Sequence, residues 1–390
     1  MELFTYTPIE LLLLTTVSVL FIVQFIYYWK IYSRIHSHNV ATEKGKINFS
    51  QELPPLSVIL YAHNEAENLQ KNLKCILEQD YPTFEVIVIN DASTDETETV
   101  LERLEKEYKH LYHSFTPNTA RYISHKKLAL TLGIKASKYE WLVFTEANCI
   151  PSSDQWLRLI ARNYTPNTQI VLGYSNYAHT KGWFHKKITF DTLMLSMRYL
   201  GFALSGNPYM GIGRNLSYRK ELFFNKKGYS SHLNLQRGED DLFINQFANK
   251  ENTRIETSSN AIVRIQPIEH KKEWKEEKIS YMTTSHYYQG MQRYINGLET
   301  TSRLLFHACC ISGIVVGIVN RHWVIFSLFL LLWALRYTIQ AIIINRTAKD
   351  MNEGQTFYFT LPAFDLLQPI QTAKLKLARA FRDKEDFMRK

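Results

Sequence analysis

The chain has 390 residues, enough for two or three domains, and its 45% hydrophobic and 13% aromatic content excludes an intrinsically disordered protein. Its formal charge of +9 is compatible with a nucleic acid, an anionic membrane or an anionic substrate as partner. No nucleic-acid-binding motif is present, and the basic residues gather beside apolar segments. We therefore expect a lipid bilayer, and no nucleic acid, as a partner.

The first predicted element is a transmembrane anchor within residues 1–32. Ile9–Trp29 is a predominantly apolar stretch of about twenty residues, long enough to cross a bilayer. A cleaved signal peptide is the alternative, but no basic residue precedes the stretch and no small-residue cleavage site follows it. An interfacial aromatic belt is predicted at its end: Tyr27, Tyr28 and Trp29. A basic linker over residues 33–54 follows, which by the positive-inside rule lies in the cytoplasm.

Three hydrophobic runs without polar alternation predict interior strands of a parallel sheet that is covered on both faces. The runs are Leu56–Ala62, Val86–Ile89 and Trp141–Thr145, and they end on Asn64-Glu65, Asn90-Asp91 and Glu146-Ala147-Asn148. Ser93 or Thr94 is expected to cap the helix after the second strand. Open α/β sheets bind ligands at the carboxyl ends of their strands, so Asp91 is predicted to lie in a nucleotide-sized crevice. Helix capping is the alternative role for these polar residues.

Further motifs follow the third strand. Trp183–Leu204 has the spacing of an amphipathic helix, which packs either on the core or on a membrane. Gly211-Ile212-Gly213-Arg214 combines small residues with a guanidinium that can meet a phosphate. Glu239-Asp240-Asp241 precedes a predicted helix over Leu242–Asn249. Mutual repulsion within this acidic cluster is expected to raise the pKa of one of its carboxyls.

These motifs together resemble the family 2 glycosyltransferases. The resemblance is carried, in the family's order, by SVILYAHNEAENL, VIVINDASTDET, HKKLALTLGIKAS, WLVFTEANCIP and GEDDLF, over roughly Leu56 to Phe247. It implies an inverting transferase that takes a nucleotide-diphospho-sugar donor. It also implies an α/β catalytic domain over residues 55–270, with the doubly wound, mostly parallel sheet of the glycosyltransferase A-type fold.

The resemblance assigns roles to the donor-binding residues. Asp91 is expected to meet the nucleobase, while Asn64, Glu65 and Asn90 border the nucleotide. A lysine at the start of the helix before the third strand, Lys126 or Lys127, is expected to face the donor, and Arg214 to meet a phosphate.

The resemblance also assigns the metal and the base. The family's Asp-x-Asp element, which binds ribose and Mg²⁺ or Mn²⁺, is replaced by Glu146-Ala147-Asn148, so Glu146 and Asn148 are the expected ligands of a weakly bound ion. In the acidic cluster, Glu239 and Asp241 flank Asp240, which is expected to be the general base. Asp241 is the rival base and a possible helix N-cap.

The last third of the chain predicts further membrane contact. An interfacial segment over residues 271–303 precedes a transmembrane hairpin, residues 304–346, whose outer ends face the cytoplasm. Arg336 falls inside the second span, where it must pair, snorkel, meet a lipid phosphate or mark an early end of the helix. Residues 347–390 predict an interfacial helix, broken at Pro362 and Pro369, and a basic cytoplasmic tail.

The expected protein is therefore an integral membrane glycosyltransferase of a bacterial inner membrane, with its catalytic domain in the cytoplasm. It is expected to move a sugar from a nucleotide donor, of the uridine class, to a lipid-linked or glycan acceptor in cell-envelope polysaccharide synthesis. A processive polysaccharide synthase is one alternative, although the processive members' Gln-x-x-Arg-Trp element is absent from the matching region, Trp274–Tyr288. A catalytically silent scaffold or sugar-nucleotide-binding relative is the other, favoured by the altered Asp-x-Asp.

Overall fold

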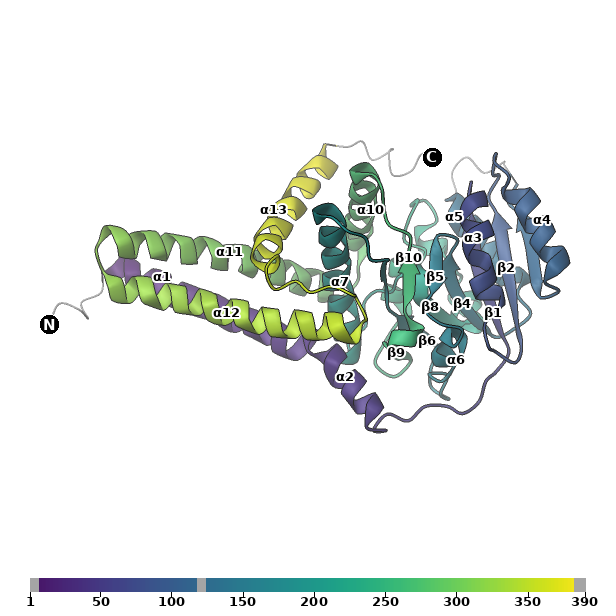
Figure 1. The fold of residues 1–390 in the computed structure, drawn as a ribbon, viewed down its shortest axis with the longest axis horizontal. Helices are drawn as coiled ribbons and strands as arrows, with labels where there is room; N and C mark the ends of the chain where they lie inside the picture. The colour runs from purple at the N-terminus through teal and green to yellow at the C-terminus, as the bar shows by residue number, and fades with distance from the viewer. Residues whose placement is uncertain (1–6, 118–123, 382–390) are drawn as a thin grey trace.

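The computed structural model describes residues 7–117 and 124–381, which form a bundle of long helices joined to an α/β domain. The helices are α1 Pro8–Tyr27, α2 Arg34–Glu43, α3 Ala66–Leu77, α4 Thr97–Glu107, α5 His125–Ala136, α6 Trp156–Ala161, α7 Trp183–Leu204, α8 Lys220–Asn225, α9 Asp241–Phe247, α10 Lys271–Thr284, α11 Gln292–Val319, α12 Trp323–Asp350 and α13 Leu361–Ala380. In Figure 1 the bundle of α1, α11 and α12 extends away from the α/β domain, and α7, α10 and α13 lie between the two.

The α/β domain is built on a mixed sheet with the strand order β3-β2-β1-β4-β8-β6-β9 and a smaller sheet with the order β5-β10-β7. The strands are β1 Leu56–Ala62, β2 Phe84–Asn90, β3 Leu111–Phe115, β4 Trp141–Glu146, β5 Cys149–Pro151, β6 Ile170–Gly173, β7 Ser175–Tyr177, β8 Leu216–Arg219, β9 Thr253–Glu256 and β10 Val263–Ile265. β3, β2, β1 and β4 are parallel, whereas β8 runs antiparallel to β4 and β6. The predicted doubly wound, mostly parallel sheet is thus confirmed.

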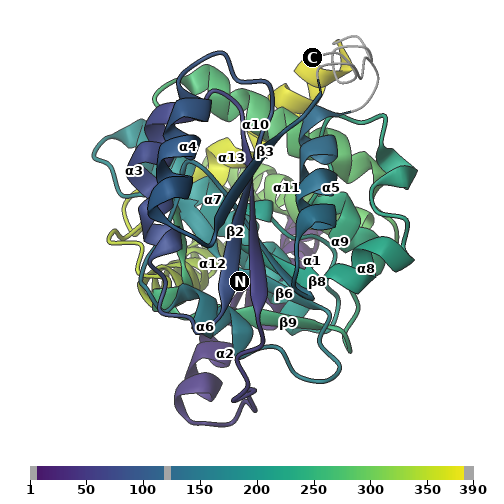
Figure 2. The ribbon, with the colours of Figure 1, turned by 90° about the vertical axis from the view of Figure 1, so that its right-hand side faces the viewer.

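Helices cover both faces of the parallel strands, which explains why these strands lack polar alternation. Val58 and Leu60 of β1 pack in one core cluster with residues of α3 and α4, while Ile59 packs in another with residues of α5. Figure 2 shows α3 and α4 on one side of the strands and α5 on the other. The register pairs Ala62 with Asn90 and Tyr61 with Glu146, so the carboxyl ends of β1, β2 and β4 lie level with one another.

Two predicted helix caps were wrong. α4 begins at Thr97, and the backbone N–H of Thr97 donates to Asp95, so neither Ser93 nor Thr94 caps it. The N-cap of α9 is Asp240, whose carboxylate accepts from the backbone N–H of Asp241. In both cases more than one residue of the turn can act as a cap, and the path of the chain into the helix decides which one does.

Within residues 7–117 and 124–381, three helices are long and apolar enough to cross a membrane: Pro8–Glu43, Tyr294–Val319 and Trp323–Asp350. The first is continuous through a π-helical turn, Tyr28–Tyr32 (η2), into α2, where the sequence predicted a linker. The predicted first span includes an acidic residue, Glu10, which caps α1 with Thr7 and contacts His322 at 3.2 Å. The helix end and the turn between α11 and α12 therefore lie at the same end of the bundle.

The polar residues inside the spans pair with one another. Arg336 on α12 lies 2.6 Å from Asp365 on α13. Of the four alternatives given for Arg336, pairing with another residue is the one found in the structure. Tyr28 was predicted to lie in an interfacial belt, but it is 1% exposed and accepts a hydrogen bond from Gln340. α13 itself continues through Pro369 instead of breaking there. Its contacts with α7, α10 and α11 hold it against the α/β domain.

Candidate active site

The carboxyl ends of β1, β2 and β4 bring the predicted donor-binding residues to one edge of the sheet. Asp91 directly follows β2 and is 4% exposed. Its Oδ2 accepts from the Tyr61 hydroxyl at 2.8 Å, and its Oδ1 accepts from the Thr116 hydroxyl and lies 3.2 Å from His125 Nδ1. Three neighbours therefore fix the carboxylate, although an ionised carboxylate has about four acceptor positions.

Asn64 and Asn90 stabilise the two loops beside Asp91. The side-chain oxygen of Asn64, a residue with φ of +55°, accepts from the backbone N–H of Thr94 at 2.8 Å. Asn90 donates to Glu98 at 2.6 Å, and its oxygen accepts from the backbone N–H of Ser93. Asn64 thus ties the loop after β1 to the loop after β2, and Asn90 stabilises the loop after β2 itself.

Glu65 lies next to these loops. Its carboxylate accepts from the Asn68 amide, and burial raises the pKa of Glu65 above its usual value.

Glu146 is the centre of a charged cluster at the end of β4. Its two oxygens lie 2.7 Å from Lys126 Nζ and 2.8 Å from Arg214 Nε. Burial alone would raise the pKa of Glu146, but these two cations hold it well below the usual glutamate value. Lys126 also lies 3.0 Å from Glu239, and Arg214 lies 2.8 Å from Glu277 on α10. The cluster thus alternates positive and negative groups and keeps Glu146 ionised.

The two lysines at the start of α5, Lys126 and Lys127, lie in different environments. Lys126 lies in the cluster just described, and although burial opposes it, Glu146 and Glu239 hold the pKa of Lys126 above its usual value. Lys127 is fully buried, and its Nζ donates to the carbonyls of His232, Leu235 and Arg237 at 2.6, 2.8 and 2.9 Å. Burial lowers the pKa of Lys127 to about 8. The structure thus does not bring Lys127 to the site; it supports the loop that leads to Glu239.

The acidic cluster begins α9. Asp240 accepts from the backbone N–H of Gly213 at 2.8 Å, so the Gly-x-Gly segment and the acidic cluster lie side by side. Burial and the neighbouring charge of Glu239 raise the pKa of Asp240. By contrast, burial alone would raise the pKa of Glu239, but Lys126 and Arg237 lower it. Asp240 is partly exposed and lines a cavity of about 560 Å³.

Asp241 has different surroundings from Asp240. It is 1% exposed, and its carboxylate accepts from the Tyr288 hydroxyl at 2.8 Å and from the Thr284 hydroxyl. Burial and the charge of Asp240 raise the pKa of Asp241 to about 7. With the backbone N–H of Leu242, three groups donate to this carboxylate, and the side chain thereby joins α9 to the end of α10.

The cavity of about 560 Å³ contains most of the predicted catalytic and phosphate-binding residues. Its lining includes Lys126, Glu146, Asn148, Arg214, Glu239, Asp240 and Asp241. Asn64, Glu65, Asn90, Asp91 and Lys127 lie outside this lining. The structure therefore groups the acidic cluster with the end of β4, and places the Asp91 region along the same sheet edge.

The residues available for a metal ion are few. Glu146 offers an ionised carboxylate, and Asn148 offers an amide oxygen, which lies 3.4 Å from the Cys149 thiol. Within the described residues, no group of three or more His, Cys, Asp or Glu side chains could hold an ion. Mg²⁺ is commonly bound by one or two protein oxygens together with substrate phosphates and water, so this donor set fits an ion held mainly by a diphosphate.

One wall of the cavity, formed by α10, was not predicted. Glu277, Tyr281 and Thr284 recur at helical spacing and line the cavity. Tyr177 of β7 donates to Glu277, and Glu277 pairs with Arg214. The spacing of these three residues in WKEEKISYMTT was the available signal, but only the fold brings α10 to Arg214.

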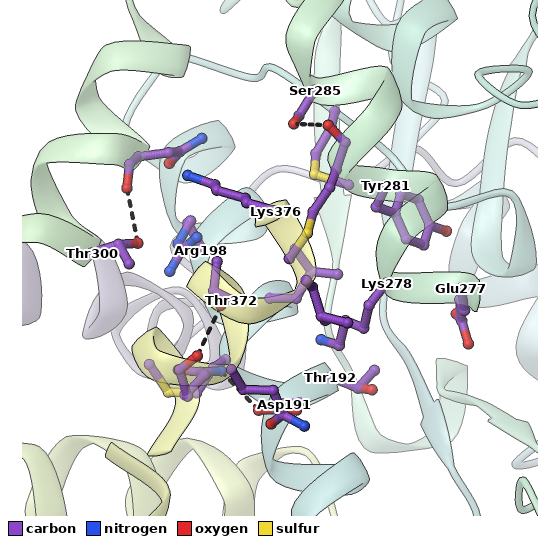
Figure 3. A pocket seen from close by; sticks show the side chains of 18 of the residues that line it. Asp191, Thr192, Arg198, Glu277, Lys278, Tyr281, Ser285, Thr300, Thr372 and Lys376 are labelled. Carbon is purple, nitrogen blue, oxygen red and sulfur yellow. Dashed lines mark hydrogen bonds between the residues drawn. The ribbon is translucent and has the colours of Figure 1, made fainter. Parts of the chain in front are cut away.

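A second cavity of about 520 Å³ adjoins the first, and both are lined by Tyr177, Ile212, Arg214, Glu277 and Tyr281. It extends between α7, α10, α11 and α13, towards the helices of the bundle. In Figure 3, Arg198, Lys278 and Lys376 come from three different helices around this space. Arg198 is paired with Glu299 at 2.9 Å, whereas Lys278 and Lys376 have no ion pair within the described part of the chain. The second cavity thus has a mixed lining of basic and apolar side chains, and it lies on the bundle side of the site.

Comparison with known proteins finds similarity over part of the chain. Residues 57–224 match the family described as Glycosyl transferase family 2. Poly-beta-1,6-N-acetyl-D-glucosamine synthase from Staphylococcus epidermidis is 28% identical over 137 residues, which are 35% of this chain and 31% of that protein. Glycosyltransferase AglE from Haloferax volcanii is 33% identical over 107 residues, 27% of this chain and 34% of that protein. The matches thus span about a third of these relatives' lengths.

A solved structure has the same fold. Mannosyltransferase PcManGT from Pyrobaculum calidifontis, in complex with GDP-Man and Mn²⁺, superposes with a TM-score of 0.54 at 17% identity. The superposition covers 89% of this chain and all of that one. It agrees with the glycosyltransferase A-type architecture predicted from the sequence.

Proposed function

Because residues 57–224 match the glycosyl transferase family 2 and the matched relatives are glycosyl transfer enzymes, we propose that this protein is a membrane-bound inverting glycosyltransferase. It moves a sugar from a nucleotide-diphospho-sugar to a lipid-linked or glycan acceptor at the membrane. The observation that carries the proposal is the junction of the two cavities: one holds Glu146 and Asp240, and the other leads from them towards the bundle.

The donor nucleotide binds along the edge formed by β1, β2 and β4. Asp91 has one acceptor position left on Oδ2, which suits the N3–H of a uracil ring, so uridine is the preferred nucleoside class. The diphosphate then lies towards Glu146, where Lys126 and Arg214 supply fixed positive charge for the leaving group.

Glu146 and Asn148 would hold Mg²⁺ or Mn²⁺ together with the diphosphate, and the bound ion would supply positive charge to the leaving nucleoside diphosphate. Because both oxygens of Glu146 already contact cationic side chains, Lys126 and Arg214 supply part of this charge themselves.

Asp240 removes the proton from the acceptor hydroxyl. It is the partly exposed carboxylate of the acidic cluster, and its raised pKa makes it a better base than an ordinary aspartate. The backbone N–H groups of Gly213 and Asp241 orient its two oxygens. In-line attack on the opposite side from the leaving diphosphate inverts the anomeric configuration.

The acceptor enters through the second cavity. The mixed lining, with Lys278 and Lys376 beside Met194 and Leu375, suits an amphiphilic molecule that approaches from the membrane. A catalytically silent protein would use the same first cavity to bind a nucleotide, but it would have no need of an acceptor path that reaches Asp240.

Two tryptophan substitutions on α13 test this path. Thr372 lines the second cavity, and Ala373 on the same helix is exposed and does not. With labelled uridine diphospho-sugars and either membrane lipid extract or soluble glycans as acceptors, Thr372→Trp should abolish transfer and leave nucleotide affinity unchanged. Ala373→Trp should transfer normally. Nucleotide binding without transfer by the unaltered protein, across a broad donor and acceptor panel, would instead favour the silent protein.

A further inference from the structure

A third cavity, separate from the two of the active site, lies where the bundle meets the α/β domain. It has a volume of about 380 Å³ and opens between the η2 turn, α2 and α12 (the region is seen in Figure 1). Its lining is Trp29, Lys30, Ser33, Arg34, His36, Ser37, Ile342, Ile343, Arg346 and Thr347. Basic and hydroxyl side chains thus share a pocket with two isoleucines, and none of its residues is acidic.

The positive charge in this pocket is not neutralised by the protein. Lys30, Arg34 and Arg346 form no ion pair with an acidic residue of the described chain, and all three are exposed. Asp350, an acidic residue on α12, pairs with His36 at 2.7 Å. Elsewhere, on α7, α11 and α12, the residues Arg198, Arg303 and Arg336 each contact a carboxylate. Three unpaired cations around one pocket therefore call for an anion from outside the chain.

A buried hydroxyl at the same place also lacks a partner. Thr347 lines the pocket and is fully buried, and its Oγ1 has no hydrogen-bond partner within the described residues. Leaving such a group unpaired costs about 1–3 kcal/mol, which an acceptor oxygen of a ligand would recover. The π-helical turn Tyr28–Tyr32 lies beside it, and such turns are often found at functional sites.

The pocket also lies at the expected depth of a lipid phosphate. At about 1.5 Å per residue, roughly 33 Å of helix separates Pro8 from Lys30, and roughly 35 Å separates Trp323 from Arg346. The hydrocarbon core of a bilayer is about 30 Å thick. Both helices start at the same end of the bundle, so Lys30 and Arg346 reach the interface on the α/β-domain side together. Trp29, 62% exposed, has the side chain typical of that depth.

We propose that Lys30, Arg34 and Arg346 bind the phosphate of an anionic phospholipid in the leaflet next to the α/β domain. Thr347, whose hydroxyl has no other partner in the described chain, donates to a phosphate oxygen, and Ile342 and Ile343 contact the acyl chains. The lipid joins the η2 turn to α12, and thereby holds the first and last spans together at the point where they enter the domain. This site is distinct from the acceptor path, because none of its residues lines the other two cavities.

The test compares two double variants that remove the same charge. Arg34→Gln/Arg346→Gln alters the pocket, while Lys44→Gln/Lys349→Gln alters exposed residues outside it on the same two helices. Binding of phosphatidylglycerol to the full-length protein is measured by native mass spectrometry, and melting temperature is measured in nanodiscs of phosphatidylcholine with or without phosphatidylglycerol. We expect phosphatidylglycerol to bind and stabilise the unaltered protein and the Lys44/Lys349 variant.

The Arg34/Arg346 variant should bind phosphatidylglycerol roughly thirtyfold more weakly, because each basic residue near an anionic lipid contributes about a fivefold factor. Equal losses in the two variants would overturn the proposal, since they would indicate only general charge attraction. Equal stabilisation by inorganic phosphate would also overturn it, in favour of a soluble anion. The variants' melting temperatures in pure phosphatidylcholine report whether they fold, and single substitutions of Arg34 and Arg346 replace the double variant if it does not.

Discussion

At the scale of single residues, Asp240 and Asp241 show how neighbours in the chain acquire different roles. Asp240 accepts two backbone N–H groups and keeps part of its carboxylate open to the first cavity. Asp241 is buried among hydroxyl donors of α10 and the turn after it. The first arrangement leaves a carboxylate able to take a proton from a substrate, and the second uses the carboxylate to hold two helices together.

The first prediction follows from this difference. Asp240→Asn should lower turnover by roughly a hundredfold or more, the usual size of a general-base contribution, while nucleotide affinity stays near normal. Asp241→Asn should reduce turnover far less, but destabilise the fold by about 1–3 kcal/mol, because a buried hydroxyl loses an acceptor. Single-turnover rates and thermal unfolding of both variants check this. A near-normal Asp240→Asn beside an inactive, well-folded Asp241→Asn would reverse the two roles.

The second prediction concerns pH. Asp240 must be ionised to act as a base, and its pKa is raised by burial and by Glu239, so kcat/KM should rise with pH through a value above that of an ordinary aspartate. Glu239→Gln removes one of these two causes and so lowers the pKa of Asp240. The rise of kcat/KM on the acidic side of the pH profile (the acidic limb) should therefore move to lower pH. Glu67→Gln, at an exposed residue on α3, should leave the limb in place. A limb that moves to higher pH in Glu239→Gln would exclude Asp240 as the titrating group.

The third prediction concerns the metal. Asn148 contributes a neutral oxygen, so Mg²⁺ or Mn²⁺ should strengthen nucleotide binding only modestly in the unaltered protein. Asn148→Asp adds a second anionic ligand, which should tighten nucleotide binding when Mn²⁺ is present. Without metal, the added charge should weaken binding, because it repels the diphosphate. Calorimetric titrations of uridine diphosphate with and without Mn²⁺ measure both effects, and an unchanged metal dependence would exclude Asn148 from the metal site.

At the scale of elements, the sequence predicted the strands and helices that are specified by a local pattern of apolar and polar residues. The strands β1, β2 and β4 and the helix α7 appear at their predicted places, because buried apolar runs and helical spacing are local signals. The same holds for the acidic residues at strand ends, since parallel strands share one carboxyl edge.

Features that depend on tertiary partners were not predictable in this way. α11 begins at Gln292, more than ten residues before the predicted span, because packing on α1 and α13 supports a polar first part of the helix. Lys126 and Lys127 are equivalent in sequence, but only the loop around His232 decides which of them is buried. The contribution of α10 to the site likewise required the fold.

The fourth prediction concerns the attachment of α13 to the bundle. Asp365 pairs with Arg336 at 2.6 Å and with His307 at 2.8 Å, and all three are buried. Asp365→Ala should destabilise the protein by about 3–5 kcal/mol, because it leaves Arg336 as an uncompensated buried charge. Arg336→Met/Asp365→Leu should recover part of the loss, because it removes both charges of the pair while Arg303, which also contacts Asp365, keeps Glu299 at 3.6 Å. Thermal unfolding in detergent checks this, and Asp350→Ala, at a half-exposed pair with His36, is the matched control with a small effect.

At the scale of the whole molecule, the direction of the three long helices determines how the protein sits in a membrane. Glu10 near the start of α1 contacts His322 in the turn between α11 and α12, so these two segments share one end of the bundle. The opposite end carries Lys30, Arg34 and Arg346 and joins the α/β domain. Because basic residues are in excess at that end, we propose from the positive-inside rule that it faces the cytoplasm.

The fifth prediction is the resulting topology. In a variant without its four native cysteines, a cysteine at Arg321 should react with a membrane-impermeant maleimide in intact cells, because the turn lies on the outer side. Cysteines at Lys44 and Lys374, both exposed, should react only after the cells are opened, since α2 and α13 lie beside the α/β domain. Retained transfer activity in each variant shows that it is folded. Labelling of Lys374→Cys from outside would require a further crossing after α12, and labelling of Lys44→Cys from outside would place the active site on the opposite side of the membrane.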